Sequence, residues 1–245
     1  MARVFITGST DGLGRNAALE LLAAGHDVIV HARSHERLQA VADLRERGAS
    51  GVVGDLSDLT ATRELAEQVG TLGPLDAVIH NAGAGVGSGG ILLPVNVVAP
   101  YVLTAALDRP GRLIYLSSGM HYDGSARLDG LDWSGTTATA NYSDTKLLVT
   151  TLCMAIAHRW PDVLSNAVDP GWVPTRMGGP NATDNLDLGH ATQTWLAVST
   201  DPEALTSGGY WHHRQQQDPH PATRDPAFQG KLLEALAKHT GVPLL

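Results

Sequence analysis

Short apolar runs alternate with longer amphipathic segments along the whole chain. Each run is too short for a helix and is bounded by glycine, proline or polar residues, which predicts buried strands. The segments between the runs repeat apolar residues every three to four positions, which predicts helices. The predicted strands lie at residues 4–7, 27–32, 51–54, 75–80, 112–117, 162–169 and 209–211.

The predicted helices begin and end at residues that favour such boundaries. Ser34 is suited to cap one helix, and Gly25 and Gly48 follow two of them as stop signals. Pro94 and Pro100 are expected to start or kink another helix, because proline lacks the backbone N–H. The helices are predicted at residues 13–24, 34–47, 59–69, 91–107, 139–159, 186–198 and 228–239.

The regular alternation of strand and helix predicts the fold class. It is typical of right-handed crossover units that build a parallel sheet covered on both faces. No linker or repeat divides the chain, and the polar, proline-rich residues 214–226 resemble a surface excursion. We therefore predict an α/β protein, a single-domain Rossmann fold whose doubly wound, mostly parallel seven-stranded sheet is flanked by helices.

Composition and charge argue against several classes of protein. Hydrophobic residues make up 43% of the 245 residues and charged residues 17%, as in a folded globular protein. A net charge of −8 without a basic run argues against a nucleic-acid partner. There is one cysteine, Cys153, and we see no signal peptide and no apolar stretch of the ~18 residues that span a bilayer. We expect a cytoplasmic protein with no membrane partner.

A metal site is not expected either. His212, His213 and His220 form the densest group of potential ligands near the end of the chain. No carboxylate or cysteine stands at ligand spacing around them, so a group of surface histidines is the simpler interpretation.

The turn between the first strand and the first helix is rich in glycine. Gly12-x-Gly14-x-x-Ala17 fits the dinucleotide fingerprint, and its place between a strand and a helix is the one that this fingerprint requires. Positions without side chains let the backbone approach a pyrophosphate, and the free N–H groups and dipole of the helix favour that anion. The expected cofactor contacts in this turn are Gly8, Ser9, Thr10, Gly12, Leu13 and Gly14.

The end of the second strand predicts which cofactor binds. A site for NAD places a carboxylate about 20 residues after the glycines, where it bonds the ribose hydroxyls. This chain has Arg33 there, and a guanidinium can hold a 2′-phosphate, so we expect NADP(H) in preference to NAD(H). A solvated arginine is the alternative interpretation. Further contacts are expected after the third and fourth strands, at Asp55, Leu56, Asn81, Ala82 and Gly83.

Tyr142 and Lys146 stand four residues apart within a predicted helix. Residues at this spacing lie on one face, about 6 Å apart along the axis. A phenol with an ordinary pKa of about 10 is a poor acid or base near neutrality, but a nearby ammonium, together with the charge of an oxidised nicotinamide, lowers that pKa. Ser117 and Ser118 end the fifth strand, at the sheet edge where α/β proteins bind ligands, and Asn96 lies in the preceding helix.

These motifs resemble the short-chain dehydrogenase/reductase family over nearly the whole chain. The neighbourhoods of His31 and Met120 are similar to its retinol-dehydrogenase-like and carbonyl-reductase-like branch, although the membrane-anchoring N-terminal segment of some such relatives is missing. The matching motifs, in order, are Thr7-Gly8, Gly12-Leu13-Gly14, Asn81-Ala82-Gly83, Asn96, Ser117-Ser118, Tyr142 with Lys146, and Pro170-Gly171.

The resemblance implies a role for each residue. Tyr142 would donate a proton to a carbonyl oxygen in reduction, or accept one from an alcohol in oxidation, and Lys146 would lower its pKa and hold the nicotinamide ribose. Ser118, rather than Ser117, would bond the substrate oxygen. Asn96 would anchor, through its helix backbone, a water that connects Lys146 to solvent. The other implied cofactor contacts are Pro170, Gly171, Val173 and Thr175, with residues 172–190 as a substrate lid.

The predicted function is that of an NADPH-dependent oxidoreductase that interconverts a small-molecule carbonyl compound and its alcohol by hydride transfer. Residues 1–245 would form one NAD(P)-binding domain that contains the catalytic site. Few charges in the lid favour an apolar substrate, and the resemblance implies a homodimer or homotetramer through the Asn96 and Tyr142 helices.

Two other functions are weighed against this prediction. An NADP(H)-binding regulatory or sensor protein of the same fold would not turn over substrate, but it would have no evident use for Ser118, Tyr142 and Lys146 together. A serine hydrolase would need a Gly-x-Ser-x-Gly turn, and neither Ser117 nor Ser118 has glycine two positions before it.

Overall fold

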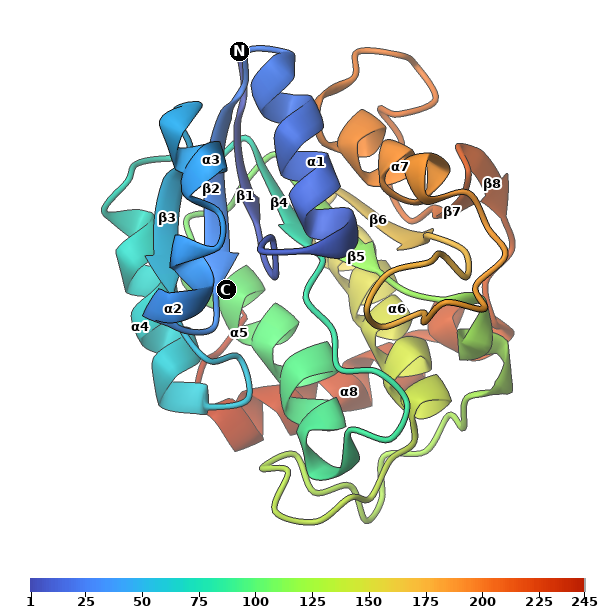
Figure 1. Cartoon of the computed structure of the whole chain (residues 1–245). Helices are drawn as coiled ribbons and strands as arrows, with labels where there is room; N and C mark the ends of the chain where they lie inside the picture. The colour runs from blue at the N-terminus through green and yellow to red at the C-terminus, as the bar shows by residue number, and fades with distance from the viewer. Residues whose placement is uncertain (245) are drawn as a thin grey trace.

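A single mixed sheet runs through the molecule in the strand order β3-β2-β1-β4-β5-β6-β7-β8 (Figure 1). In the computed structural model, which describes residues 1–244, the strands β1 to β7 are parallel and β8 pairs antiparallel with β7. The strands are β1 (Arg3–Ile6), β2 (Asp27–Ala32), β3 (Ser50–Val53), β4 (Ala77–His80), β5 (Arg112–Leu116), β6 (Leu164–Asp169), β7 (Tyr210–His212) and β8 (Gln215–Gln217).

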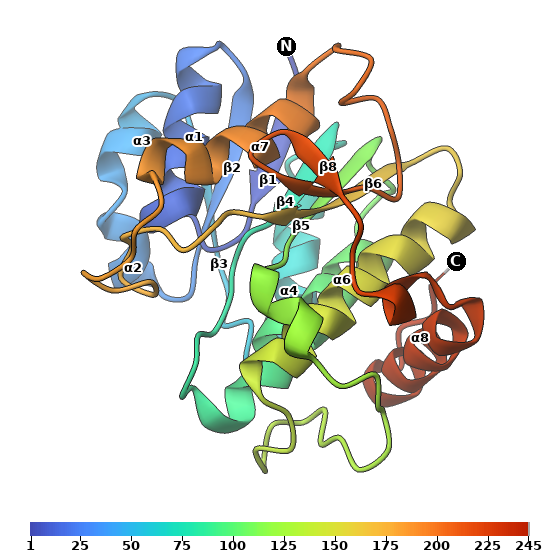
Figure 2. The same ribbon diagram turned by 90° about the vertical axis from the view of Figure 1, so that its right-hand side faces the viewer.

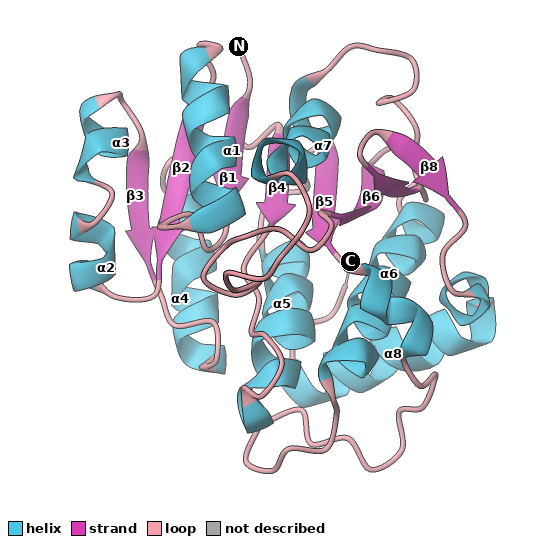
Figure 3. Ribbon diagram, turned by 45° about the vertical axis from the view of Figure 1, so that its right-hand side comes forward, coloured by secondary structure: helices cyan, strands magenta, loops and turns pink. Residues whose placement is uncertain are grey.

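Helices cover both faces of the sheet (Figures 1 and 3). One face carries α1 (Gly12–Ala23), α3 (Ala42–Glu46) and α7 (Leu186–Val198), and the short α2 (His35–Gln39) lies against β2 and the edge strand β3. The other face carries α4 (Leu59–Gly70), α5 (Ala99–Ala106) and α6 (Tyr142–Arg159), with α8 (Pro226–Thr240) outside α6. Short helical turns are η1 (Gly89–Ile91), η2 (Pro94–Val98), η3 (Gly119–Asp123) and η4 (Pro221–Arg224).

The core is divided by the sheet into two layers because successive strand residues point to opposite faces. In β1, Val4 and Ile6 pack with the α1 and α7 side, whereas Phe5 packs with the α4, α5 and α6 side. All three side chains are fully buried, as expected of a central parallel strand covered by helices on both sides. Because β1 lies between β2 and β4, the chain reverses direction across the sheet there, and ligands of α/β proteins bind at this point.

Three sequence predictions needed correction. The helix predicted over residues 34–47 is interrupted between α2 and α3, where Val41 leaves the helical conformation and its side chain is fully buried in the core. The sheet has an eighth strand, β8, because Gln215–Gln217 folds back on β7 through the left-handed residues His213 and Arg214. The predicted helix 91–107 is divided into η1, η2 and α5.

The expectation that no segment is long and apolar enough to span a bilayer was wrong. Within residues 1–244, the helical stretch Gly89–Ala106 meets that criterion by length and composition. In this fold 67% of the stretch is buried inside the protein, and its α5 part packs against α4. Burial within the core accounts for its apolar composition.

The outer side of α6 is covered by the chain's own C-terminal segment. Figure 2 shows α8 lying alongside α6, and the two helices pack closely. Beyond α8, the carbonyl of Val242 accepts a hydrogen bond from the Tyr101 hydroxyl of α5 at 2.8 Å. A homo-oligomer formed through the helices that carry Asn96 and Tyr142 therefore requires that α8 and the following residues move. The predicted oligomer stays a prediction.

Candidate active site

The predicted site residues lie on loops at one edge of the sheet, where β1, β4, β5 and β6 end (Figure 3). The glycine-rich turn follows β1 and leads into α1, and the loop after β4 crosses beside it. Ser118 follows β5, and Tyr142 and Lys146 lie on the first turns of α6. Parallel strands bring these distant segments together because all their carboxyl ends meet at this edge.

The glycine-rich turn approaches its neighbours too closely for side chains. A Cβ on Gly14 would lie 2.3 Å from Nδ2 of Asn81 and 2.6 Å from the carbonyl oxygen of Gly8. The Asn81 amide donates hydrogen bonds to the carbonyls of Thr7, at 2.9 Å, and Gly8, at 3.1 Å. Asn81 thus holds the turn in shape from the neighbouring strand end.

His31 fixes the same turn from β2, although the sequence analysis assigned it no role. Its Nδ1 accepts a hydrogen bond from the Gly8 N–H at 2.9 Å, and Nε2 lies 2.8 Å from the carbonyl of Gly54. This arrangement requires a neutral imidazole with its proton on Nε2. Burial lowers the pKa of His31 and keeps it neutral. Ser9 is also structural, since its buried hydroxyl bonds Ile6 and His31.

The first turn of α1 is open to an anion. Asp11 is the N-cap residue, but its side chain makes no capping hydrogen bond to the helix. Uncapped N–H groups at a helix N-terminus, together with the helix dipole, bind phosphate groups. The turn therefore fits the pyrophosphate of a dinucleotide.

Two arginines lie beyond this turn. Arg33 is exposed and makes no hydrogen bond or ion pair within residues 1–244. Arg37 was missed by the sequence analysis, and its guanidinium donates to Oγ1 of Thr10 at 3.0 Å and lies 3.4 Å from a carboxylate oxygen of Asp11. Its place in the first turn of the Ser34-capped helix, soon after Arg33, was the available signal.

The expected contacts after β3 differ in exposure. Asp55 is exposed, and its Oδ1 accepts hydrogen bonds from the N–H and hydroxyl of Ser57 at 2.9 and 2.7 Å. Leu56 is 7% exposed and packs in the core cluster on the α4 side. Asp55 keeps a free carboxylate oxygen, while Leu56 mainly supports the loop.

Tyr142 and Ser118 meet at the end of β5. Tyr142 is the first residue of α6, and a capping box between Asn141 and Asp144 fixes that helix end. The Ser118 side chain lies close enough to the Tyr142 hydroxyl to lower its pKa. Ser117 points the other way, where its hydroxyl is buried and lies 2.6 Å from that of Thr150. Of the two serines, the geometry presents only Ser118 to Tyr142.

Burial dominates the proton affinities of the pair on α6. The pKa of Tyr142 is raised to about 12, mainly by burial; the nearby Ser118 side chain opposes this rise and the negative charge of Asp169 adds to it. Burial lowers the pKa of Lys146 to about 8, against the opposing effect of Asp169. The expected lowering of the tyrosine pKa by the ammonium together with an oxidised nicotinamide therefore stays a prediction for the cofactor complex. At neutral pH the phenol is protonated.

Lys146 is directed at the end of β5. Its Nζ donates to the carbonyl of Leu116 at 2.7 Å and lies 5.5 Å from the centre of the Tyr142 ring. A Cβ on Gly83 would lie 3.7 Å from this Nζ and 3.5 Å from Oδ1 of Asn96. The ammonium has two more N–H donors for ligand oxygens.

Asn96 links three segments of the site. Its Oδ1 accepts from the Ala84 N–H at 2.7 Å, and its Nδ2 donates to the Ala84 carbonyl and to Oγ1 of Thr145. It lies in η2, a π-helical segment in which the Ala99 N–H bonds the carbonyl of Pro94. π-helical turns are frequent at functional sites. The side chain is fully used in positioning, so any bound water would contact the backbone.

The segment predicted as a lid runs across the site. Thr175 lies against the glycine-rich turn, 3.3 Å from the position of a Cβ on Gly12. Met177 approaches Gly83 and Gly85, close to Lys146. Trp172 ties the segment together, since its N–H bonds the Asp184 carboxylate and its indole bonds the Gly178 carbonyl. The last residues of the predicted range 172–190 belong to α7.

The other predicted contacts on this segment differ in accessibility. Pro170 and Gly171 are partly exposed beside the site, and Gly171 has a left-handed φ of 80°. Val173 is 4% exposed and packs against Gly189 of α7. The polypeptide around these residues can contact a cofactor, whereas the Val173 side chain holds the segment to α7.

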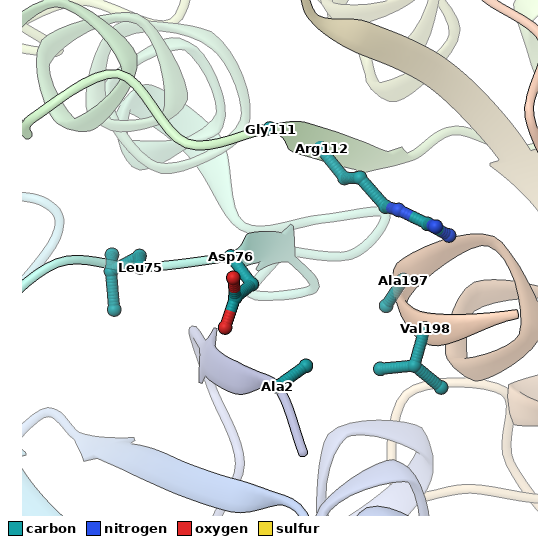
Figure 4. Close-up of a pocket in the computed structure, with 7 residues that line it drawn as sticks. All are labelled: Ala2, Leu75, Asp76, Gly111, Arg112, Ala197 and Val198. Carbon is teal, nitrogen blue, oxygen red and sulfur yellow. The ribbon is translucent and has the colours of Figure 1, made fainter.

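A separate hollow lies at the opposite edge of the sheet. Figure 4 shows its lining at the start of β1, β4 and β5, with the Asp76 carboxylate and the Arg112 guanidinium on either side. Asp76 accepts from the Arg3 N–H at 2.7 Å, and Arg112 donates to the Leu196 carbonyl at 2.9 Å. These groups are used in holding the fold, and none of the predicted site residues lies here. Over residues 1–244 no cluster of three or more metal-ligating side chains is found.

Fold and site together define an α/β protein whose glycine-rich turn fits a dinucleotide and whose neighbouring sheet edge carries Tyr142 and Lys146. A family model described as short chain dehydrogenase matches residues 2–118. The short-chain dehydrogenase chyC of Penicillium rubens is 37% identical over 100% of this chain and 99% of its own. An uncharacterized oxidoreductase of Emericella nidulans is 35% identical over 99% of this chain and 98% of its own. The chain belongs to the short-chain dehydrogenase/reductase family and is an oxidoreductase of that family.

The predicted branch of the family is also represented among its relatives. Retinol dehydrogenase 13 of Homo sapiens is 27% identical over 98% of this chain and 84% of its own. Among solved structures, a protein of Mycobacterium paratuberculosis matches with a TM-score of 0.83 and 22% identity over 100% of this chain and 95% of its own. The NADP complex of RhlG from Pseudomonas aeruginosa matches with a TM-score of 0.70 and 22% identity over 86% of this chain and 94% of its own. The predicted fold class is confirmed, with eight strands in place of seven.

Proposed function

We propose that this chain is an NADPH-dependent oxidoreductase that interconverts a carbonyl compound and its alcohol. The observation that carries the proposal is the meeting of Ser118, Tyr142 and Lys146 beside a glycine-rich turn that fits a dinucleotide. The reduced nicotinamide supplies the hydride when it is bound. The chain's own residues position the carbonyl and supply the proton.

Tyr142 is the proposed proton donor. Its raised pKa keeps the phenol protonated at neutral pH, so that it can give a proton to a carbonyl oxygen as negative charge develops there. Ser118, whose side chain lies near the phenol, holds the same oxygen. Lys146 provides positive charge one helical turn away and donates to ribose hydroxyls. These roles favour the reductive direction at neutral pH.

The preference for NADPH is supported by Arg33. Arg33 directly follows β2, where a site for NAD has a carboxylate, and its guanidinium is exposed. Arg37 adds a second positive charge near the same turn. RhlG, a protein of similar fold, is described in complex with NADP.

The surroundings of the site favour an apolar substrate. Large hydrophobic side chains that are at least 43% exposed lie on the segments after β5 and β6, although soluble proteins usually bury such groups. They are Met120, Tyr122, Trp172 and Met177. A relative in the same family, retinol dehydrogenase 13, is named for an apolar alcohol.

The test is consumption of NADPH against a panel of apolar aldehydes and ketones, with NADH as the matched cofactor control. Turnover that favours NADPH supports the proposal. Tight NADPH binding with no turnover of any panel member would instead favour a binding protein without this activity. Equal rates with NADH would contradict the cofactor preference.

A further inference from the structure

Thr145 is a fully buried residue between the two members of the pair on α6. Its Oγ1 lies 2.8 Å from the carbonyl oxygen of Tyr142 and 2.9 Å from Nδ2 of Asn96. These two contacts join the first turn of α6, which carries the proposed proton donor, to the π-helical segment η2. The sequence analysis gave Thr145 no role.

The hydrogen bonds at Thr145 have a single direction. The Ala84 N–H donates to Oδ1 of Asn96 at 2.7 Å, which identifies the other atom of that side-chain amide as the nitrogen. Both N–H groups of this nitrogen are used, one by the Ala84 carbonyl at 3.0 Å and one by Oγ1 of Thr145. The Thr145 hydroxyl therefore accepts from Asn96 and gives its one hydrogen to the Tyr142 carbonyl.

The other end of this chain of hydrogen bonds is the loop after β4. Ala84 directly follows Gly83, and a Cβ on Gly83 would lie 3.7 Å from Nζ of Lys146. The loop therefore passes the ammonium at close range. The hydrogen bonds through Asn96 hold this loop in place relative to the helix turn that carries Tyr142.

The end of α6 does not depend on Thr145 to form. A capping box between Asn141 and Asp144 fixes the first turn separately. Loss of the Thr145 hydroxyl would instead leave one N–H of Asn96, which is 2% exposed, without its acceptor. A buried donor without a partner is unfavourable, so the neighbouring groups would shift to satisfy it. The expected result is a displaced Tyr142 on an intact helix.

We propose that Thr145 is a positioning residue, whose hydroxyl, held by Asn96, fixes Tyr142 relative to the loop after β4. The inference rests on the proposed reductase function. Thr145 is fully buried and acts through the Tyr142 backbone, so it affects the proton-transfer step more than the binding of cofactor or substrate.

The test measures NADPH oxidation in a single turnover, with the carbonyl compound of the panel that wild type reduces fastest. Thr145→Val keeps the shape of the side chain and removes the hydroxyl. Its rate at saturating substrate is expected to fall by about 10- to 100-fold, because a displacement of about 1 Å can reduce a rate by about 100-fold. The half-saturating substrate concentration and the NADPH dissociation constant should stay within about threefold of wild type.

Two further variants separate the hydroxyl from general packing. Thr145→Ser keeps the hydroxyl and should keep most of the wild-type rate. Thr151→Val is the matched control, because Thr151 is equally buried on the same helix and its hydroxyl donates to the Leu147 carbonyl within that helix at 2.9 Å. It should leave the rate unchanged. Thermal unfolding of each variant shows whether it is folded.

Amide hydrogen exchange at Ala84 reports the same linkage without turnover. The Ala84 N–H is bound by Asn96, so Thr145→Val should speed its exchange, whereas Thr145→Ser and Thr151→Val should not. Unchanged exchange in Thr145→Val overturns the inference even if no carbonyl compound is reduced.

The outcomes separate this inference from the proposed function. A wild-type rate in Thr145→Val overturns the inference and leaves the reductase function intact. An equal loss of rate in Thr145→Ser or in Thr151→Val also overturns it, because the Thr145 hydroxyl would then not be the group that matters. No NADPH consumption by wild type with any member of the panel would count against the function itself.

Discussion

The ammonium of Lys146 lies 5.5 Å from the centre of the Tyr142 ring, one helical turn along α6. Both side chains are largely removed from water, so each resists the charge that the other would stabilise. The phenol keeps its proton more tightly than a free tyrosine, and the ammonium holds its proton less tightly than a free lysine. Opposed pKa shifts of this kind are common among catalytic acids and bases.

Tyr142→Phe is expected to reduce turnover by about 10²- to 10⁴-fold, the usual contribution of a general acid. Only the transferable proton is lost, so the NADPH dissociation constant should stay within a few-fold of wild type. Stopped-flow NADPH consumption and cofactor fluorescence measure the two quantities. Tyr101→Phe is the matched control. It removes a tyrosine hydroxyl on α5 that donates to the Val242 carbonyl, away from the site. More than a tenth of wild-type turnover in Tyr142→Phe would exclude it as the acid.

Arg33→Ala is expected to raise the dissociation constant of NADPH by about 10- to 100-fold and to change that of NADH little. The guanidinium would hold the 2′-phosphate through charge-assisted hydrogen bonds, which NADH cannot form. Titration of both cofactors measures the effect, and Arg45→Ala on the exposed side of α3 controls for general charge. Equal weakening of both cofactors would show that Arg33 does not contact the 2′-phosphate.

Gly14→Ala tests the close approach of the glycine-rich turn. Its Cβ would lie 2.6 Å from the Gly8 carbonyl oxygen, which is backbone and cannot rotate away. We expect cofactor binding to fall at least tenfold and the protein to lose about 1–3 kcal/mol of unfolding free energy, as in overpacked interiors. Gly70→Ala at the end of α4 meets nothing within 4 Å and should be neutral or stabilising by up to about 1 kcal/mol. Similar results for both variants would contradict the steric argument.

The sheet and the motif positions could be predicted because they depend on local patterns. The runs containing Val4, Val28 and Ile114 are buried from both sides, and such runs are visible in any sequence. Residues 215–217 are three exposed glutamines and carry no apolar signal. They form β8 only because the left-handed residues His213 and Arg214 turn the chain back onto β7.

The residues missed at the site depend on tertiary placement. Asp169 ends a strand and directly precedes Pro170-Gly171, so its sequence context offers only the motif of its neighbours. Its relation to Tyr142 arises because β5 and β6 pair in register and end together. His31 likewise acts through Gly8, 23 residues away in sequence. Pattern analysis finds elements and motifs, while contacts between elements need the folded chain.

His80 provides a test of how burial controls stability against pH. It is 3% exposed on β4, its ring stacks 4.6 Å from that of Tyr115, and its Nδ1 has no hydrogen-bond partner in the described chain. Burial lowers its pKa to about 3. Between pH 6.5 and about 3 the unfolded chain therefore binds a proton here that the folded chain does not. The contribution of neutral His80 to the free energy of unfolding is therefore fully present above pH ~6.5 and is lost as the pH drops through this window.

His80→Phe should flatten that dependence by up to about 1.4 kcal/mol per pH unit, the contribution of one proton. Urea unfolding at a series of pH values from about 4 to 7.5 measures the slope. At pH 7 the variant should lie within about 1 kcal/mol of wild type, since it loses the Nε2 contact with Thr104 but also removes the unsatisfied Nδ1. Tyr115→Phe alters the same cluster without a group that titrates in this window, so its slope should match wild type. An unchanged slope in His80→Phe would mean that His80 does not stay neutral in the folded chain.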